Sequence, residues 1–301
     1  MLIHIFKKFW NIVDIQDKKR IANQIPTPGI KEIIDIPYIN DGTRQHKLDI
    51  YYKEGIQDKQ PVIIDIHGGG WMYGTKEINK YYNMVLASRG YTVVSINYRL
   101  VPDADVGDQI RDCFSAFKWV SENIKNYYGD SENIFLTGDS AGGFLASHTA
   151  VINTSEKLKK IYNISEPDIK FNAVGLTSPV CYLETNKAEK IYYNMILGQN
   201  YKSAPYYGLV NLDKVIDCGV MPPTFLVTSS GDAVAKEATK RVFELLKSKN
   251  IKSEYMYWKK TDGKNLPHVF SVIDPYSVPG IKTIDKMLAF FKKFEVITAK
   301  A

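Results

Sequence analysis

The chain has 301 residues and a formal net charge of +6, and 45% of its residues are hydrophobic. This composition excludes the disordered and fibrous classes and allows a single domain spanning residues 1–301. The basic residues are spread along the chain with no basic run between stacking aromatics, so we expect no nucleic-acid partner.

Cysteine content and the N-terminal stretch bear on location. Cys113, Cys181 and Cys218 are odd in number and lack metal-ligand spacing, which favours reduced thiols in a cytoplasmic protein. Lysines inside the first apolar stretch argue against a secretory signal. No 18 uncharged apolar residues run together, so no stable membrane insertion is predicted. The stretch "LIHIFKKFW" is expected to form a helix that caps one end of the fold. An open alternative is that it binds a membrane surface through its basic aromatic face.

Alternating apolar runs and helical patterns follow one another along the chain. The expected strands are 33–39, 46–53, 61–67, 91–98, 133–138, 171–178, 224–230 and 253–259. Apolar residues at three-and-four spacing predict helices over 110–124, 234–246 and 284–294, and a further helix follows the strand at 133–138. This alternation is typical of an α/β fold with a mostly parallel eight-stranded sheet and helices on both faces.

Two parts of the chain do not follow the alternation. The first two strands are separated by "NDGTR", whose Asp41-Gly42 pair predicts an antiparallel hairpin at one edge of the sheet. Residues 1–30 and 181–216 lack a clear place in the sheet, and we expect them to form a small helical cap over one end.

One serine is flanked by glycines directly after an expected strand. "GDSAG" (138–142) follows "NIFLT" and precedes a helical pattern, as in a nucleophile elbow. Glycines let such a turn close tightly and leave the Ser140 hydroxyl exposed at the carboxyl end of the sheet, where open α/β folds bind ligands. The structural alternative is a turn that merely packs a helix on a strand.

A second glycine cluster follows the strand at 61–67. In "HGGGW" (67–71), consecutive backbone N–H groups can converge on an oxyanion. The glycine spacing fits neither of the phosphate-binding motifs G-x-x-x-x-G-K-S/T and G-x-G-x-x-G, so we do not expect a phosphate loop. His67 stands on this loop itself and is expected to brace it.

A serine hydroxyl needs a general base, which in turn needs an orienting carboxylate. Among the histidines, His268 is favoured because it lies between the last strand and the last helix, whereas His4, His46, His67 and His148 are better explained as structural. Asp232 directly follows the strand at 224–230, although alone it would be interpreted as a helix N-cap. The chain order Ser140, Asp232, His268 is the order in which hydrolases with a nucleophile elbow on an α/β sheet carry serine, acid and histidine. Asp262 and Asp274 remain fallback carboxylates.

At these residues the chain resembles the hormone-sensitive-lipase-like esterase family of α/β-hydrolases. The likeness covers about residues 33 to 295 and rests on the motifs "HGGGW", "NYRLVPD", "GDSAGG", "SSGDAVAKEA" and "LPHVF". It implies an acyl-enzyme mechanism with Ser140 as nucleophile, His268 as base and Asp232 as its partner. It further implies that the amides of Gly69, Gly70 and Ala141 bind the oxyanion, and that Asn97 and Arg99 are scaffold.

The chain departs from the family pattern at two places. After "NYRL" it has Asp103 and a shorter turn in place of a Pro-Glu pair, and after Asp232 it has Val234 and Lys236 where relatives often carry leucine and aspartate. Neither change removes a reacting group, but because of them the resemblance does not define the shape of the pocket.

The sequence therefore predicts a serine carboxylesterase for short-chain acyl esters, with a small-molecule substrate and no metal or organic cofactor. Aromatic residues of the expected cap would wall its pocket: Phe6, Phe9, Trp10, Tyr192, Tyr193, Tyr206 and Tyr207. Three alternatives stay open, namely a deacetylase for acetylated sugars, an amidase or peptidase with the same residues, and a non-catalytic small-molecule binder. A homodimer is also left open.

Overall fold

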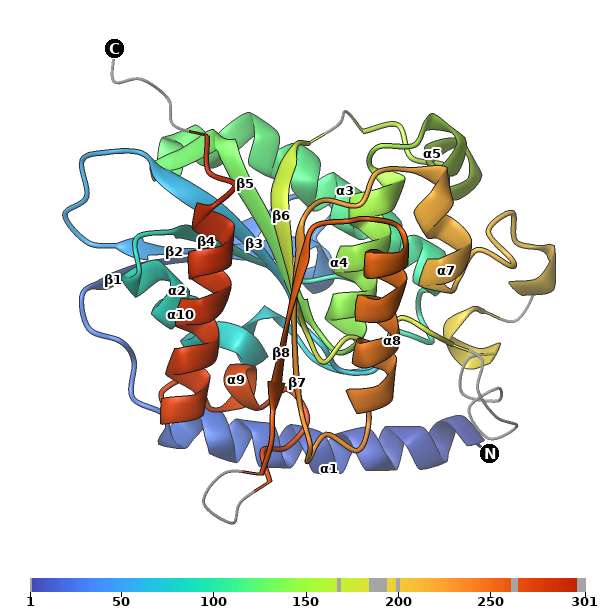
Figure 1. Cartoon of the computed structure of the whole chain (residues 1–301), viewed down its shortest axis with the longest axis horizontal. Coiled ribbons are helices and arrows are strands. Elements are labelled where there is room, and N and C mark those ends of the chain that lie inside the picture. The colour runs from blue at the N-terminus through green and yellow to red at the C-terminus, as the bar shows by residue number, and fades with distance from the viewer. Residues whose placement is uncertain (1, 167–168, 184–193, 199–200, 261–264, 297–301) are drawn as a thin grey trace.

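A computed structural model describes residues 2–166, 169–183, 194–198, 201–260 and 265–296. Its centre is one eight-stranded sheet in the order β1-β2-β4-β3-β5-β6-β7-β8 (Figure 1). The strands are β1 (Ile30–Pro37), β2 (Lys47–Lys53), β3 (Gln60–Ile66), β4 (Thr92–Ile96), β5 (Gly129–Asp139), β6 (Phe171–Thr177), β7 (Thr224–Ser229) and β8 (Ser253–Trp258).

The predicted strand content is confirmed. All eight strands form within a few residues of the expected ranges, and the sheet is parallel from β4 to β8. As predicted, β1 and β2 pair antiparallel, and β1 lies at the edge. β2 also joins β4 antiparallel, so the antiparallel part of the sheet is confined to one side. Strands β3 to β7 are almost entirely buried because helices cover both faces.

Two sets of helices cover the two faces. The helices are α1 (Leu2–Asn23), α2 (Lys80–Ser88), α3 (Val106–Asn123), α4 (Ala141–Ile152), α5 (Glu156–Tyr162), α7 (Leu212–Val215), α8 (Lys236–Ser248), α9 (Phe270–Ile273) and α10 (Val278–Lys292). Apolar residues of α3, α4 and α8 share one buried cluster, and those of α2, α9 and α10 share another. The sheet between these clusters leaves its carboxyl end uncovered by either set.

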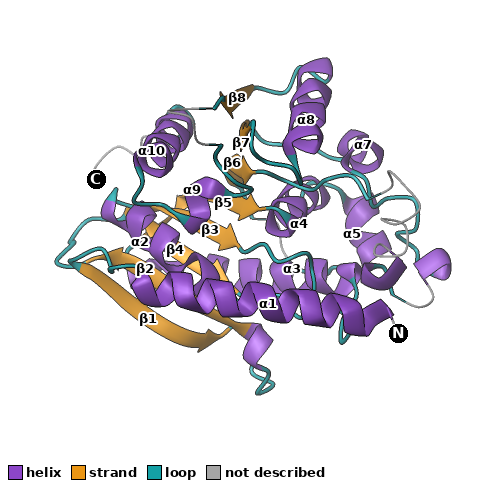
Figure 2. Cartoon of the chain, turned by 90° about the horizontal axis from the view of Figure 1, so that it is seen from below, coloured by secondary structure: helices purple, strands orange, loops and turns teal. Residues whose placement is uncertain are grey.

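Helix α1 lies across that carboxyl end, outside both layers, as Figures 1 and 2 show. The sequence did not predict it as one helix of 22 residues. No helix in the described part of the chain is both long and apolar enough to cross a bilayer.

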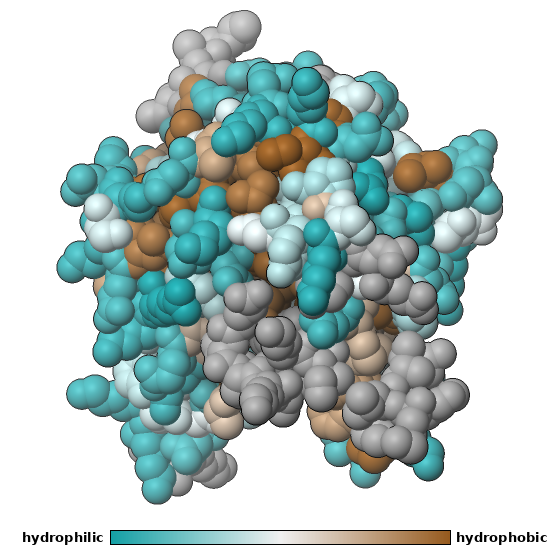
Figure 3. All heavy atoms as spheres, turned by 90° about the vertical axis from the view of Figure 1, so that its right-hand side faces the viewer, coloured by the Kyte–Doolittle hydropathy of each residue, from teal (hydrophilic) through white to brown (hydrophobic). Residues whose placement is uncertain are grey.

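The other expected cap segment, 181–216, is described only in part. Tyr192 and Tyr193 lie outside the described residues. Tyr206 is buried, with its ring stacked on Tyr162 at 5.2 Å between centroids. The face that carries this segment is seen in Figure 3, where hydrophilic side chains predominate among the described atoms and apolar ones gather toward the top.

Candidate active site

Ser140 stands at the turn from β5 into α4 with a backbone that few non-glycine residues adopt. Its φ is +52° and its ψ is −114°. Its amide donates to the carbonyl of Thr177 on the neighbouring strand, and its own carbonyl accepts from Val180 and Phe144. These bonds hold the strained conformation in place, as strained residues at functional sites require.

The glycines around Ser140 are needed because the backbone approaches itself closely. A Cβ on Gly138 would lie 2.3 Å from the carbonyl oxygen of Gly142, and a Cβ on Gly142 would lie 2.0 Å from that of Ile66. Both distances are too short for real contacts. Any side chain at either position would therefore push α4 away from β3 and β5.

The three residues chosen from chain order meet in space. The Nε2 atom of His268 lies 2.9 Å from Ser140 Oγ, and its Nδ1 atom lies 2.9 Å from Asp232 Oδ1. Each residue follows a different strand, namely β5, β7 and β8, and all three arrive at the same edge of the sheet. The arrangement places a proton acceptor next to the hydroxyl and a carboxylate behind that acceptor.

Asp232 is fully enclosed by hydrogen-bond donors. Besides His268, its Oδ1 accepts the amides of Val234 and Ala235, and its Oδ2 accepts the hydroxyl of Thr228 at 2.8 Å. Burial alone would raise the pKa of Asp232, but the bonds from His268 and Ala235 outweigh it and hold the pKa well below its usual value. The carboxylate is therefore charged at neutral pH.

The interpretation of Asp232 as a helix N-cap is wrong. The N-cap of α8 is Ala235, and the helix begins at Lys236 rather than at residue 234. Asp232 instead organises the turn before the helix, through the amides of Val234 and Ala235. Val234, counted in the helical pattern, lies in the turn before the helix, where it is exposed and lines the same cavity as Ser140.

The loop after β3 adopts the backbone that its glycines allow. Gly69 and Gly70 have φ values of +115° and +57°, and a Cβ on Gly69 would lie 2.0 Å from the carbonyl oxygen of Tyr73. Ala141 is the first residue of α4, where helix N–H groups have no partner within the helix. Gly69 and Gly70 line the same cavity as Ser140 and His268.

His67 and His148 have partners away from Ser140. His67 is fully buried, donates to the carbonyl of Gly68 and stacks on Tyr98 at 4.4 Å, and burial lowers its pKa to about 4. His148 is also fully buried and bonds to the carbonyl of Phe144. The side chain of His4 and the fallback residue Asp262 lie outside the described residues. Asp274, the other fallback, is exposed at the end of α9.

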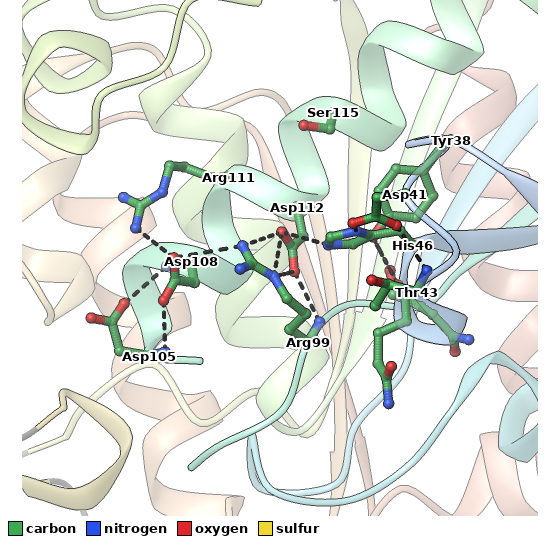
Figure 4. A network of polar contacts seen from close by, with 12 residues as sticks. Tyr38, Asp41, Thr43, His46, Arg99, Asp105, Asp108, Arg111, Asp112 and Ser115 are labelled. Carbon is green, nitrogen blue, oxygen red and sulfur yellow. Dashed lines mark hydrogen bonds and ion pairs between the residues drawn. The ribbon is translucent and has the colours of Figure 1, made fainter. Parts of the chain in front are cut away.

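His46 and Arg99 belong to a polar network on α3, seen in Figure 4. The guanidinium of Arg99 donates to Asp112, which is buried, and His46 lies between Asp112 and Asp41. The carboxylate of Asp112 beside it raises the pKa of His46. None of these residues lines the cavity at Ser140.

A cavity of about 570 Å³ opens over the serine, and we refer to it as the Ser140 cavity. It is lined by Phe9, Trp10, Val13, Gln16, Asp17 and Arg20 of α1, together with Gly69, Gly70, Trp71, Tyr73, Ile78, Asn79, Asp139, Ser140, Val180, Val234, His268, Val269 and Ile273. Tyr206 and Tyr207, expected as wall residues, are not in this lining, since Tyr206 packs against Tyr162 instead.

Sequence reasoning missed the polar contacts that join α1 to the site. Trp10 stacks on Tyr73 at 5.4 Å, and the Tyr73 hydroxyl donates to Asp17. Arg20 donates to the carbonyls of Ile78 and Ile273, on the other two segments beside the cavity. No sequence motif marks these residues, because their partners lie 50 or more positions away.

Asp139 was also missed, although it lies inside the quoted "GDSAG". Its Oδ1 accepts the amide of Gly68 at 3.0 Å and the side-chain amide of Asn79 at 2.9 Å. The residue beside the serine thus holds the glycine loop after β3 against the elbow. The sequence signal that could have identified Asp139 was its position in "GDSAG", directly before Ser140.

Comparison with known proteins agrees with this fold. Esterase B from Lactobacillus rhamnosis, in a crystal structure with a C4-C4 tributyrin phosphonate, superposes with a TM-score of 0.92 at 28% identity, covering 97% of this chain and 94% of that one. An esterase of the bacterial hormone-sensitive lipase family is 19% identical, with a TM-score of 0.69 over 92% of this chain and 89% of that one, and shares the fold.

A curated relative matches in sequence over a shorter stretch. A probable isoprenylcysteine alpha-carbonyl methylesterase of Oryza sativa subsp. japonica is 31% identical over 135 residues, which are 44% of this chain and 32% of that protein. The match therefore spans about a third of that relative's length. The BD-FAE family model matches residues 48–246, which run from within β2 to within α8 and include both glycine motifs. With the α/β-hydrolase fold and this match over most of its length, the chain belongs to the BD-FAE family.

Proposed function

We propose that the chain is a serine carboxylesterase that hydrolyses short-chain acyl esters. The observation that carries this proposal is the pair of 2.9 Å contacts that link Ser140 Oγ to His268 and His268 to Asp232. The relatives support it, since the similar proteins described above are named as esterases.

The first half of the proposed reaction forms an acyl-enzyme. Ser140 Oγ attacks the ester carbonyl while His268 Nε2 takes its proton. The amides of Gly69, Gly70 and Ala141 receive the negative charge that develops on the carbonyl oxygen. Asp232, charged and buried, stabilises the imidazolium, which then gives its proton to the leaving alcohol.

The second half releases the acid. Water attacks the acyl group on Ser140, His268 takes its proton, and the serine leaves with that proton restored. No step in this cycle calls for a metal ion or an organic cofactor.

Short acyl groups are proposed from the size and walls of the Ser140 cavity. A volume of about 570 Å³ is within the range of small-molecule sites and is shared by both arms of the ester. Phe9, Trp10 and Val13 of α1 close it on the outer side. We infer that residues 1–30 act as a cap within a single domain, and the tributyrin phosphonate found with the Lactobacillus esterase fits a short-chain substrate.

An acyl-length profile tests the proposal. A series of p-nitrophenyl esters from acetate to dodecanoate should give the highest kcat/KM on short chains. A best substrate longer than about ten carbons would contradict the small acyl site. The Ser140→Ala variant should lower kcat by roughly a million-fold, as loss of the serine does in comparable enzymes.

Labelling with a fluorophosphonate probe tests separately whether Ser140 is a reactive nucleophile. The probe should label the wild-type chain and leave Ser140→Ala unlabelled. If the wild type stays unlabelled and hydrolyses no ester, the chain is a binding protein and the proposed function is wrong.

A further inference from the structure

A second cavity of about 720 Å³ adjoins the Ser140 cavity, and we call it the flanking cavity. Its apolar lining is Leu266, Pro267, Phe270, Ile273 and Pro279, and its polar lining is Arg20, Asn23, Gln24, Asp274 and Ser277. Arg20 and Ile273 line both cavities. These two residues therefore border both spaces.

Arg20 is fixed across this boundary from several sides. Its Nε donates to Asp17 at 2.9 Å, Nη2 to the carbonyl of Ile78 at 3.1 Å, and Nη1 to the carbonyl of Ile273 at 3.3 Å. Its side chain is only 20% exposed. A guanidinium held by acceptors on three segments cannot swing aside without losing several hydrogen bonds at once.

Residues that neighbour His268 in the chain line the flanking cavity. In the proposed mechanism His268 protonates the leaving oxygen, so the alcohol part of the ester must lie next to the imidazole. Leu266 and Pro267 directly precede His268, and Phe270 follows it closely, and all three line the flanking cavity. The oxyanion loop with Gly69 and Gly70 lines only the Ser140 cavity.

We propose that Arg20, together with Ile273, is a specificity-determining partition that keeps long linear alkyl alcohols of the ester out of the flanking cavity. This inference rests on the proposed esterase function. Behind the partition, the flanking cavity offers the apolar walls that a longer alkyl alcohol needs. Arg20→Ala or Ile273→Ala joins the two cavities and admits esters of longer linear alcohols.

Acetate esters of linear alcohols isolate this effect. All of them form the same acetyl-enzyme, so kcat/KM differs among them only through binding and acylation. The readout is the ratio of kcat/KM for hexyl acetate to that for ethyl acetate within each protein, in which a general loss of activity cancels. We expect this ratio to rise by about tenfold or more in Arg20→Ala and in Ile273→Ala.

Thr27→Val is the matched control. The Thr27 hydroxyl lies 3.0 Å from that of Tyr276 and so ties the segment after α1 to the segment before α10, yet it lines neither cavity. Its ratio should equal that of the wild type. If Thr27→Val raises the ratio as much as Arg20→Ala does, loosening of the N-terminal segment is the cause and the partition is wrong.

The remaining outcomes separate this inference from the proposed function. Unchanged ratios in both Arg20→Ala and Ile273→Ala, with ethyl acetate still hydrolysed in a Ser140-dependent way, overturn the partition alone. Ile273→Ala decides the matter if Arg20→Ala does not fold, because the Ile273 side chain carries none of the hydrogen bonds. A wild type that hydrolyses none of the acetates overturns the esterase function and the partition with it.

Discussion

The carboxylate of Asp232 is bonded both to the side chain of His268 and to backbone amides of the turn that follows it. One oxygen of its carboxylate meets both His268 and the amides of Val234 and Ala235. The position of the imidazole is therefore set by a rigid turn rather than by a free side chain. Chain order and strand ends led to the choice of Asp232, but residue 234 of the turn that holds it was assigned to the helix, which begins at Lys236.

Asp232→Asn should reduce kcat for p-nitrophenyl acetate by roughly 10⁴-fold, because an amide neither holds the required histidine tautomer nor stabilises its charged form. Asparagine keeps an oxygen that can accept the turn amides, so circular dichroism should still report a folded protein. Asp58→Asn, a change at an exposed residue that does not line the Ser140 cavity, is the control and should match the wild type. Near-normal kcat in Asp232→Asn would point to another carboxylate.

At the scale of elements, the strands were predictable, whereas the extent of α1 as one helix of 22 residues was not, although a helical segment was expected within residues 1–30. The buried parts of β3 to β7 are short apolar runs with β-branched residues, so composition marks them, although β5 has 11 residues and begins before its apolar run. In α1 the inward side mixes Trp10, Gln16 and Arg20, while Ile12 and Ile15 are more than half exposed. An apolar stripe is the signal that predicts a packed helix, and α1 has polar contacts in its place.

The junction of β5 and α4 yields a prediction for Gly142. Since a Cβ there would lie 2.0 Å from the carbonyl oxygen of Ile66 and 2.5 Å from that of His67, Gly142→Ala must displace α4 or the glycine loop. We expect a loss of about 1–3 kcal/mol in the free energy of unfolding, together with a large loss of esterase activity. Urea unfolding and a p-nitrophenyl acetate assay measure both. Unchanged activity would mean that the elbow does not depend on this contact.

At the scale of the whole molecule, the buried carboxyl group of Asp65 makes the free energy of unfolding depend on pH. Asp65 is 1% exposed and accepts hydrogen bonds from Asn79, Asn83 and Thr137. Burial, reinforced by the nearby Asp139, raises the pKa of Asp65 to about 7. The folded chain therefore binds this proton more tightly than the unfolded chain does.

The sign of the pH dependence follows from that difference. The contribution of Asp65 to stability is fully present below the pKa of the unfolded chain, about 4, and is lost as the pH rises toward 7. Urea unfolding should show that the free energy of unfolding of the wild type is lower at pH 7.5 than at pH 5. The decrease should be smaller in Asp65→Asn. Equal slopes in the two proteins would mean that Asp65 is already ionised at pH 5.

The order of the strands also limits how this architecture can diverge. Ser140 follows β5 and Asp232 follows β7, and β6 lies between them. Two strand spacings are about 10 Å, a gap that one imidazole with a hydrogen bond at each end can bridge. Loops and outer helices can be exchanged in evolution without altering this span. Inserting a strand beside β6 would add about 5 Å and separate Ser140 from Asp232 beyond the reach of one imidazole.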